Sequence, residues 1–234
     1  MRAWQIPKIW NKGECWIIGG GSSIIQQFHI PEDVVDAVYT KKEPLSAYSP
    51  YMKAIHSKHV IGVNMAYQLG NWIDFCFFGD DAWFDEHRER LRQFRGIKVS
   101  CAISFDKPSP RNAQEKIKFV PKNKSRSHGI SDFPNTVSWN SNSGAAAISL
   151  AYHLGATKIV LVGFDMKHND DGNSHWHNEY QVTKSAVFSR HLKGFPGIAL
   201  DAERLGLTIL NASPNSAIDV FPRYSVEEIL NGKI

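Results

Sequence analysis

The sequence places two histidines around a tryptophan in the polar stretch Asn173-Ser174-His175-Trp176-His177. An unperturbed histidine has a pKa of about 6.5, so near neutral pH its ring can accept a proton or bind a metal ion. We therefore predict that His175 or His177 is a catalytic base, with a metal ligand or an unused surface histidine as the other interpretations. The spacing does not choose between the two rings.

A glycine-rich stretch is the second candidate for chemistry. The apolar run Cys15-Trp16-Ile17-Ile18 ends at Gly19-Gly20-Gly21-Ser22-Ser23. Glycines let backbone N–H groups approach an anion closely, and the serine hydroxyls add donors at the start of the next helix. The stretch is neither G-x-G-x-x-G nor a P-loop, because no lysine follows it. It predicts a phosphate-binding loop, and a tight strand-to-helix turn is the alternative.

Other polar residues also stand at the ends of apolar runs. Asn64 follows the run 60–63, Asp80 and Asp81 follow 75–78, Asp165 comes shortly after 158–162, and Asn211 ends 208–211. Ligands of an open parallel sheet bind beyond the carboxyl ends of its strands, so we expect these residues to share one edge with the glycine loop. The two adjacent aspartates are candidates for a metal ion or a ribose hydroxyl, or for a helix cap.

The elements that must position these residues alternate between strands and helices. Besides the apolar runs, which we expect to be strands, one helix is predicted from Ser143-Gly144 to Leu154, before Gly155, and another through Ala199 and Leu205, before Gly206. This order predicts an α/β fold with an open, mostly parallel, Rossmann-like sheet and helices on both faces. We expect a single nucleotide-binding domain over 1–234, in which the polar, proline-containing segment 104–140 is a loop or lid excursion.

The composition is that of a globular protein, with 42% hydrophobic and 21% charged residues in a chain of 234. A net charge of +4 does not by itself predict nucleic-acid binding. The three cysteines lack metal-binding spacing, no apolar run approaches the length of a membrane span, and the first residues do not resemble a signal peptide. We therefore expect a cytoplasmic protein with no membrane span.

Taken in order, these motifs resemble the bacterial lipooligosaccharide sialyltransferases, the related archaeal 6-hydroxymethyl-dihydropterin pyrophosphokinases and unassigned phage proteins. The resemblance covers most of the chain and is poorest over 104–140. It is carried by residues 17–23, Val63-Asn64, the stretch from Asn142-Ser143-Gly144 to Leu154-Gly155, residues 159–165, Asn173-Ser174-His175 and Pro214-Asn215-Ser216.

In these sialyltransferases the glycine loop, a strand-end asparagine and a Ser-Gly helix start hold a CMP-sugar without a metal, and a histidine shortly after the Ser-His pair is the base. The resemblance implies a nucleotide site made of Gly19, Gly20, Gly21, Ser22, Ser23, Asn64, Asp80, Asn142, Ser143 and Gly144, to which we add the strand-end Asp165, and a base at His175 or His177. The chain departs from the family in having Gly20 in place of an asparagine, Ser22 in place of a proline, and a different histidine spacing. Tyr180 is the candidate for the family's tyrosines that brace the leaving phosphate.

Three functions follow as alternatives. The first is a sialyltransferase-like glycosyltransferase that uses a nucleotide sugar, with a CMP-sugar as the first choice, and needs no cofactor. A phage-encoded enzyme is one interpretation of this function. The second is a pyrophosphokinase that uses ATP and magnesium, with Asp80, Asp81 or Asp165 as metal ligands. The third is a non-catalytic nucleotide-binding or phage assembly protein. A glycan and a nucleic acid both stay open as the acceptor, because aromatic rings stack on either.

Overall fold

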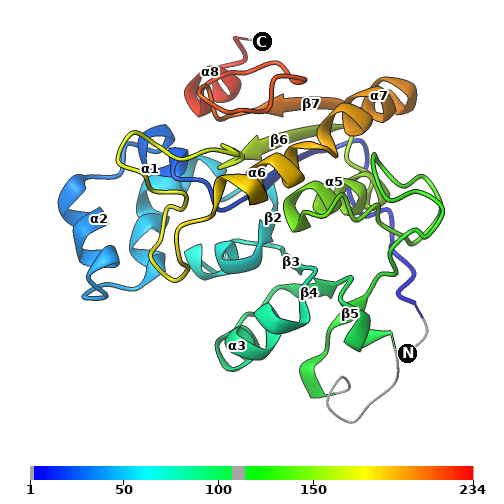
Figure 1. Cartoon of the computed structure of the whole chain (residues 1–234), viewed down its shortest axis with the longest axis horizontal. Coiled ribbons are helices and arrows are strands. Elements are labelled where there is room, and N and C mark those ends of the chain that lie inside the picture. The colour runs from blue at the N-terminus through cyan, green and yellow to red at the C-terminus, as the bar shows by residue number, and fades with distance from the viewer. Residues whose placement is uncertain (1–2, 107–113, 234) are drawn as a thin grey trace.

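A computed structural model describes residues 3–106 and 114–233. Seven strands form one parallel sheet in the order β5-β4-β3-β2-β1-β6-β7 (Figure 1). The strands are β1 (Glu14–Ile18), β2 (His59–Val63), β3 (Phe75–Phe78), β4 (Ile97–Ser100), β5 (Lys118–Phe119), β6 (Lys158–Val162) and β7 (Thr208–Asn211). The predicted open parallel α/β sheet is confirmed.

The order of the strands fixes where a ligand can enter. The chain runs outward from β1 through β2, β3 and β4 to β5, and then returns to place β6 on the other side of β1. Connections therefore leave the sheet in opposite directions at the β1–β6 boundary. In open α/β sheets a crevice forms at such a switch point, beyond the carboxyl ends of the strands.

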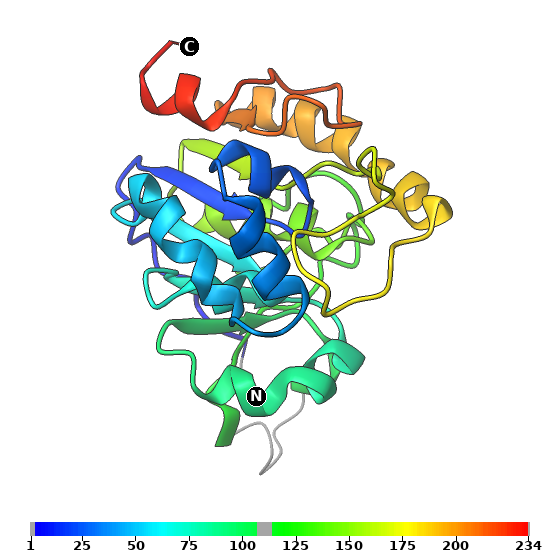
Figure 2. The ribbon, with the colours of Figure 1, turned by 90° about the vertical axis from the view of Figure 1, so that its left-hand side faces the viewer.

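Helices cover both faces of the sheet, as the strand composition predicts (Figure 2). One core packs beneath α1 (Ser23–Gln27), α2 (Glu32–Tyr39), α3 (Asp81–Arg92), α8 (Val226–Leu230) and the 3-10 segments η1 (Leu45–Ile55), η2 (Asn64–Leu69) and η3 (Ile103–Phe105). The other core packs beneath α5 (Ser143–Leu154) and α7 (Phe195–Leu205). Helix α6 (Ser185–Leu192) has no fully buried residue.

The two helices predicted from periodicity end where the sequence indicates. Gly155 caps α5 at φ 103° and Gly206 caps α7 at φ 65°, both in the left-handed region that a glycine adopts without strain. At Gly155 a side chain would also meet the Trp10 carbonyl oxygen, since a Cβ would lie 2.3 Å from it.

Segment 104–140 holds more ordered structure than the sequence prediction gave it. It contributes the edge strand β5, and Ile130 and Val137 are buried in the core beneath α5 and α7. The Ile130 N–H also donates to the Asp201 carboxylate on α7 at 2.8 Å. Residues 107–113 of this segment lie outside the described residues. In the part of the chain that the structure describes, no helix is both long and apolar enough to cross a bilayer.

Candidate functional site

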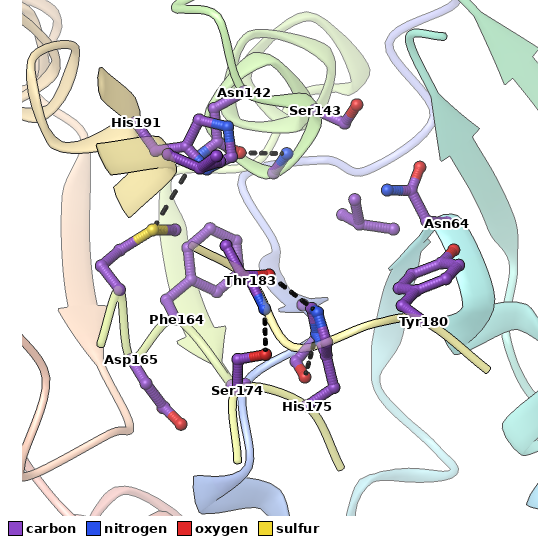
Figure 3. Close-up of a pocket in the computed structure, with 18 of the residues that line it drawn as sticks. Asn64, Asn142, Ser143, Phe164, Asp165, Ser174, His175, Tyr180, Thr183 and His191 are labelled. Atoms are coloured by element: carbon purple, nitrogen blue, oxygen red, sulfur yellow. Dashed lines mark hydrogen bonds between the residues drawn. The ribbon is translucent and has the colours of Figure 1, made fainter. Parts of the chain in front are cut away.

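A cavity of about 410 Å³ lies beyond the carboxyl ends of the central strands, at the β1–β6 switch point. Its walls come from the loops after β1 and β6, the start of η2, the start of α5, and helix α6 (Figure 3). Among the residues predicted from the sequence, it is lined by Gly19, Gly20, Gly21, Asn64, Asp80, Asn142, Ser143, Gly144, Asp165, His175, His177 and Tyr180. Ser22 and Ser23 face a second cavity of about 430 Å³, which Asp165 also lines. The roles of all these residues stay predictions.

The donors of Ser22 and Ser23 are bonded to a carboxylate of the protein itself. Asp165 Oδ2 accepts from the Ser23 backbone N–H at 2.8 Å, and Asp165 Oδ1 accepts from the Ser23 hydroxyl at 2.5 Å. The Ser22 hydroxyl lies 3.5 Å from the same carboxylate. Asp165 is 7% exposed, and its carboxylate turns away from the middle of the first cavity (Figure 3). The start of α1 therefore already holds an anion.

The three glycines allow two chain segments to approach closely. A Cβ on Gly19 or on Gly21 would lie 2.7 Å from the Gly163 carbonyl oxygen at the end of β6. A Cβ on Gly20 would instead point at His175, 3.1 Å from Nδ1. Gly19 and Gly21 thus join β1 to β6, whereas Gly20 faces the histidine.

The start of α5 presents a different arrangement. Asn142 caps this helix, because its Oδ1 accepts from the N–H groups of Gly144 at 2.8 Å and Ala145 at 3.2 Å. Gly144 allows the aromatic ring of Phe164 to approach, since a Cβ there would lie 2.9 Å from the ring. The cap is a neutral amide, so the positive end of the dipole of this helix faces the cavity without a carboxylate bonded to it.

Asn64 carries a buried acceptor that has no partner. It begins η2 with φ 51°, a left-handed conformation that asparagine tolerates better than most residues. Its Oδ1 is buried and makes no hydrogen bond within the described residues. The side chain points into the cavity (Figure 3). Since a buried unpaired oxygen costs roughly 1–3 kcal/mol, this amide is suited to receive a donor from a ligand.

The hydrogen bonds of His175 fix which ring nitrogen carries the proton. Nδ1 lies 3.3 Å from the Gly20 carbonyl oxygen, which can only accept, so Nδ1 is protonated. Nε2 lies 3.0 Å from the Thr183 hydroxyl and is the acceptor when the ring is neutral. Burial lowers the pKa of His175 against the opposing effects of the Gly20 carbonyl and Asp165. The ring is therefore a neutral base with its lone pair on Nε2.

His177 has the opposite arrangement. Its Nδ1 accepts from the Glu179 backbone N–H at 3.3 Å, which leaves the proton of the neutral ring on Nε2. Burial lowers its pKa to about 3, with smaller contributions from His175 and His87. The two rings stack at 5.4 Å, but His177 offers a donor where His175 offers an acceptor.

Tyr180 brings a phenol to the same cavity. Its hydroxyl accepts a hydrogen bond from Trp83 Nε1, which leaves the phenol hydrogen for another acceptor. Burial raises the pKa of Tyr180, so the group stays a protonated donor. Its ring packs edge-on against His175 and His177.

Three further residues of the wall were missed from the sequence: Thr183, Arg190 and His191. Arg190 is the one lysine or arginine among the described residues that line this cavity. Burial lowers the pKa of His191 to about 4. The signal available in the sequence was their position in or just before a helix that follows the histidine loop, and this helix has half-buried but no fully buried residues.

The acidic residues considered as magnesium ligands do not form one cluster. Asp80 lines the cavity as the residue before α3, and burial raises its pKa. Asp81 instead accepts a backbone hydrogen bond from Ser104 at 3.3 Å. Within residues 3–106 and 114–233, no three His, Cys, Asp or Glu side chains are grouped so as to hold a metal ion.

Comparison with known proteins returns similarity of structure alone. No protein-family model and no curated protein sequence matches the chain. Two solved structures of the sialyltransferase CstII from Campylobacter jejuni are similar to it, one with cytidine-5'-monophosphate and one with CMP-3FNeuAc. The first has a TM-score of 0.49 at 12% identity, over 92% of this chain and 86% of the other, and the second 0.48 at 12%, over 91% and 86%. The predicted resemblance to a bacterial sialyltransferase is matched by this structural similarity, whereas the predicted relations to pyrophosphokinases and phage proteins stay predictions.

Proposed function

We propose that this chain is a glycosyltransferase that uses a nucleotide sugar, with a CMP-sugar as the donor implied by the motifs it shares with the sialyltransferases. One observation carries the proposal. The capped start of α5, the unpaired amide of Asn64, the phenol of Tyr180 and the basic nitrogen of His175 all line one cavity. These groups supply what the transfer of a sugar from a nucleotide phosphate to a hydroxyl requires.

The phosphate is assigned to the start of α5. Ser143 and Gly144 line the cavity at the positive end of a 12-residue helix, and Arg190 is a cation on the facing wall. Tyr180 donates its phenol hydrogen to the same phosphate as the bond to the sugar breaks. These donors stabilise the negative charge that grows on the departing nucleotide.

His175 is the proposed base, and His177 is not. A base needs a free lone pair, and the neutral His177 ring has none to offer because its Nδ1 accepts from the Glu179 N–H and its Nε2 carries the proton. His175 has its lone pair on Nε2 and its Nδ1–H held by Gly20. His177 keeps its proton at Nε2 and acts as a neutral donor.

The first test is nucleotide binding, measured as the rise in Tm of the purified chain with CMP, CDP, UDP, GDP or ATP, each with and without Mg²⁺. A ligand that binds only the folded state must raise its stability. We expect CMP to raise Tm equally with and without Mg²⁺. Stabilisation by ATP with Mg²⁺ alone would instead support the pyrophosphokinase, and no rise with any nucleotide would contradict both enzymes.

The second test needs no knowledge of the acceptor, because water can replace it. Release of CMP from a CMP-sugar should fall by a factor on the order of 100 to 10,000 in His175→Ala, the usual contribution of a general base. The rise in Tm with CMP should stay unchanged. His128→Ala, in which an exposed histidine is removed, is the matched control and should keep the wild-type rate. A His175→Ala protein with the wild-type rate would refute the assignment.

A further inference from the structure

Thr183 is held more firmly than its position in a loop would require. Its backbone N–H donates to the Ser174 hydroxyl at 2.8 Å, and its carbonyl oxygen lies 2.6 Å from His168 Nε2. Its hydroxyl lies 3.0 Å from His175 Nε2. These contacts from three partners direct the hydroxyl into the cavity at the base (Figure 3).

The direction of the last bond follows from chemistry. Because the Gly20 carbonyl can only accept, His175 Nδ1 carries the ring proton and Nε2 carries the lone pair. Thr183 must then donate its hydroxyl hydrogen to Nε2. A hydroxyl, an imidazole and an orienting acceptor in this order form the arrangement that activates a hydroxyl oxygen in nucleophilic enzymes.

The Thr183 hydroxyl therefore covers the basic atom that the proposed function uses. An acceptor that approaches His175 Nε2 from the cavity meets the threonine oxygen first. That oxygen has lone pairs free to accept from the acceptor hydroxyl while its own hydrogen is bonded to Nε2. Thr183 and His175 can thus pass a proton in sequence, first to the Thr183 hydroxyl and then to His175 Nε2.

We propose that Thr183 relays the acceptor proton to His175, an inference that rests on the proposed glycosyltransferase function. In the step, the acceptor oxygen forms a bond to the anomeric carbon of the sugar, and the bond from that carbon to the nucleotide phosphate oxygen breaks. The bonding pair leaves with the phosphate. The acceptor proton passes to Thr183 Oγ1 as the Thr183 hydrogen passes to His175 Nε2, so the threonine is unchanged and His175 becomes an imidazolium.

The groups around His175 allow it to take up that charge. His177 stacks on it at 5.4 Å, and Tyr180 packs edge-on at the same distance. Burial disfavours the protonated ring and lowers the pKa of His175, and the Gly20 carbonyl and then the charge of Asp165 partly oppose this effect. The imidazolium formed in the step is therefore in contact with one neutral donor ring and one phenol, and the charge of Asp165 acts on it from a distance.

The test compares Thr183→Val, which keeps the shape and loses the hydroxyl, with Thr183→Ser, which keeps the hydroxyl. Release of CMP from a CMP-sugar should show kcat reduced by a factor on the order of 100 or more in Thr183→Val, because the general base is cut off. KM for the donor should stay within about twofold. Thr183→Ser should recover kcat to within about tenfold of wild type, because the relay group is restored. Thr208→Val, at the exposed amino end of β7, is the matched control.

A second readout separates relay from mere support. In the wild type the rate should fall as pH drops through the pKa of His175, and in Thr183→Val this dependence should disappear because the base no longer reaches the acceptor. Equal losses in the valine and serine variants, or a valine variant with wild-type kcat, would overturn the relay while leaving the glycosyltransferase intact. A wild-type protein that releases no nucleotide would overturn both.

Discussion

Two helix starts in this molecule have similar sequences and opposite surroundings. Ser22-Ser23 follows three glycines at the start of α1, and Ser143-Gly144 begins α5. Both combine glycine and serine at a strand-to-helix or loop-to-helix junction. The first was predicted to hold a phosphate, and the family resemblance implies that the second binds the nucleotide. At α1 the donors are bonded to Asp165, whereas at α5 the cap is the neutral Asn142 and the junction opens to the cavity.

The first junction is also closed from the side of the histidine loop. The Trp176 backbone N–H donates to the Gly20 carbonyl at 3.1 Å, and its indole N–H donates to the Gly19 carbonyl at 3.0 Å. The glycine carbonyls are thus engaged by the loop, and the serine donors by Asp165. A glycine-serine helix start is therefore an anion site only where the protein has not supplied the anion itself.

The largest expected effect follows from removing that internal anion. Asp165→Ala removes the carboxylate that accepts from the Ser23 N–H and from both serine hydroxyls, and leaves the Ser23 hydroxyl only the Ser213 hydroxyl as a neighbour. The free energy of unfolding should therefore fall by about 3 kcal/mol. Asn142→Ala, the matching change at α5, removes one neutral cap and should cost about 1 kcal/mol. Urea denaturation measures both values.

A larger loss of stability in Asn142→Ala than in Asp165→Ala would contradict the proposed difference between the two helix starts. Asp165→Asn is the check on charge, because it keeps one acceptor oxygen of the same shape. The free energy of unfolding of Asp165→Asn should lie between those of wild type and Asp165→Ala. An Asp165→Ala protein as stable as wild type would mean that the carboxylate does not fill the start of α1.

The sequence predicts the sheet well where the strands are continuous apolar runs. β1, β2, β3, β6 and β7 are each such a run, and their alternation with helices is enough to predict a parallel order. β4 was not predicted because Lys98 interrupts it, although this lysine is only 9% exposed. β5 has two residues, too few for any period. Both strands form because they pair with a neighbouring strand toward the edge of the sheet, and a local sequence pattern does not indicate such pairing.

The site shows the same division. The rule that strand ends gather at one edge agrees with the wall of the cavity for Gly19, Asn64, Asp80 and Asp165. Asn211, which was expected with them, is not among the described residues that line this cavity. The rule cannot say which donors are already satisfied. Ser23 and Asp165 are 142 positions apart in the chain, and only the fold brings them within 2.8 Å. Thr183 was missed for the same reason, since its importance comes from the His175 ring across the loop.

Acid should destabilise the histidine loop that closes the first junction. His177 has a folded-state pKa of about 3 and an unfolded pKa of about 6.5, so below pH 6.5 the unfolded chain binds a proton that the folded chain does not. Stability is therefore highest above pH 6.5 and falls as pH decreases toward 3. This single group should contribute a loss of about 2 kcal/mol between pH 7 and pH 5.

The measurement is the free energy of unfolding of wild type and His177→Gln at a series of pH values. The loss between pH 7 and pH 5 should be smaller by about 2 kcal/mol in the variant, whatever its stability at pH 7. Only the changes with pH are compared, because a glutamine side chain differs from the imidazole ring in shape and packing. If the free energy of unfolding fell equally with pH in both proteins, His177 would not be the residue whose lowered pKa makes the fold sensitive to acid.

The smallest expected effects come from removing one serine hydroxyl at each helix start. One substitution should affect CMP binding and the other should affect stability. If the α5 start binds the phosphate, Ser143→Ala should weaken CMP binding about tenfold, the loss of one hydrogen bond to a charged group, with little change in stability. Ser23→Ala should do the reverse, since its hydroxyl is bonded to Asp165 at 2.5 Å. It should lower the free energy of unfolding by about 1.5 kcal/mol and leave CMP affinity within about twofold.

Calorimetric titration gives the affinities and urea denaturation gives the stabilities. The opposite result would be weaker CMP binding in Ser23→Ala and unchanged CMP binding in Ser143→Ala. It would assign the phosphate to the glycine loop and require Asp165 to move away when the nucleotide binds.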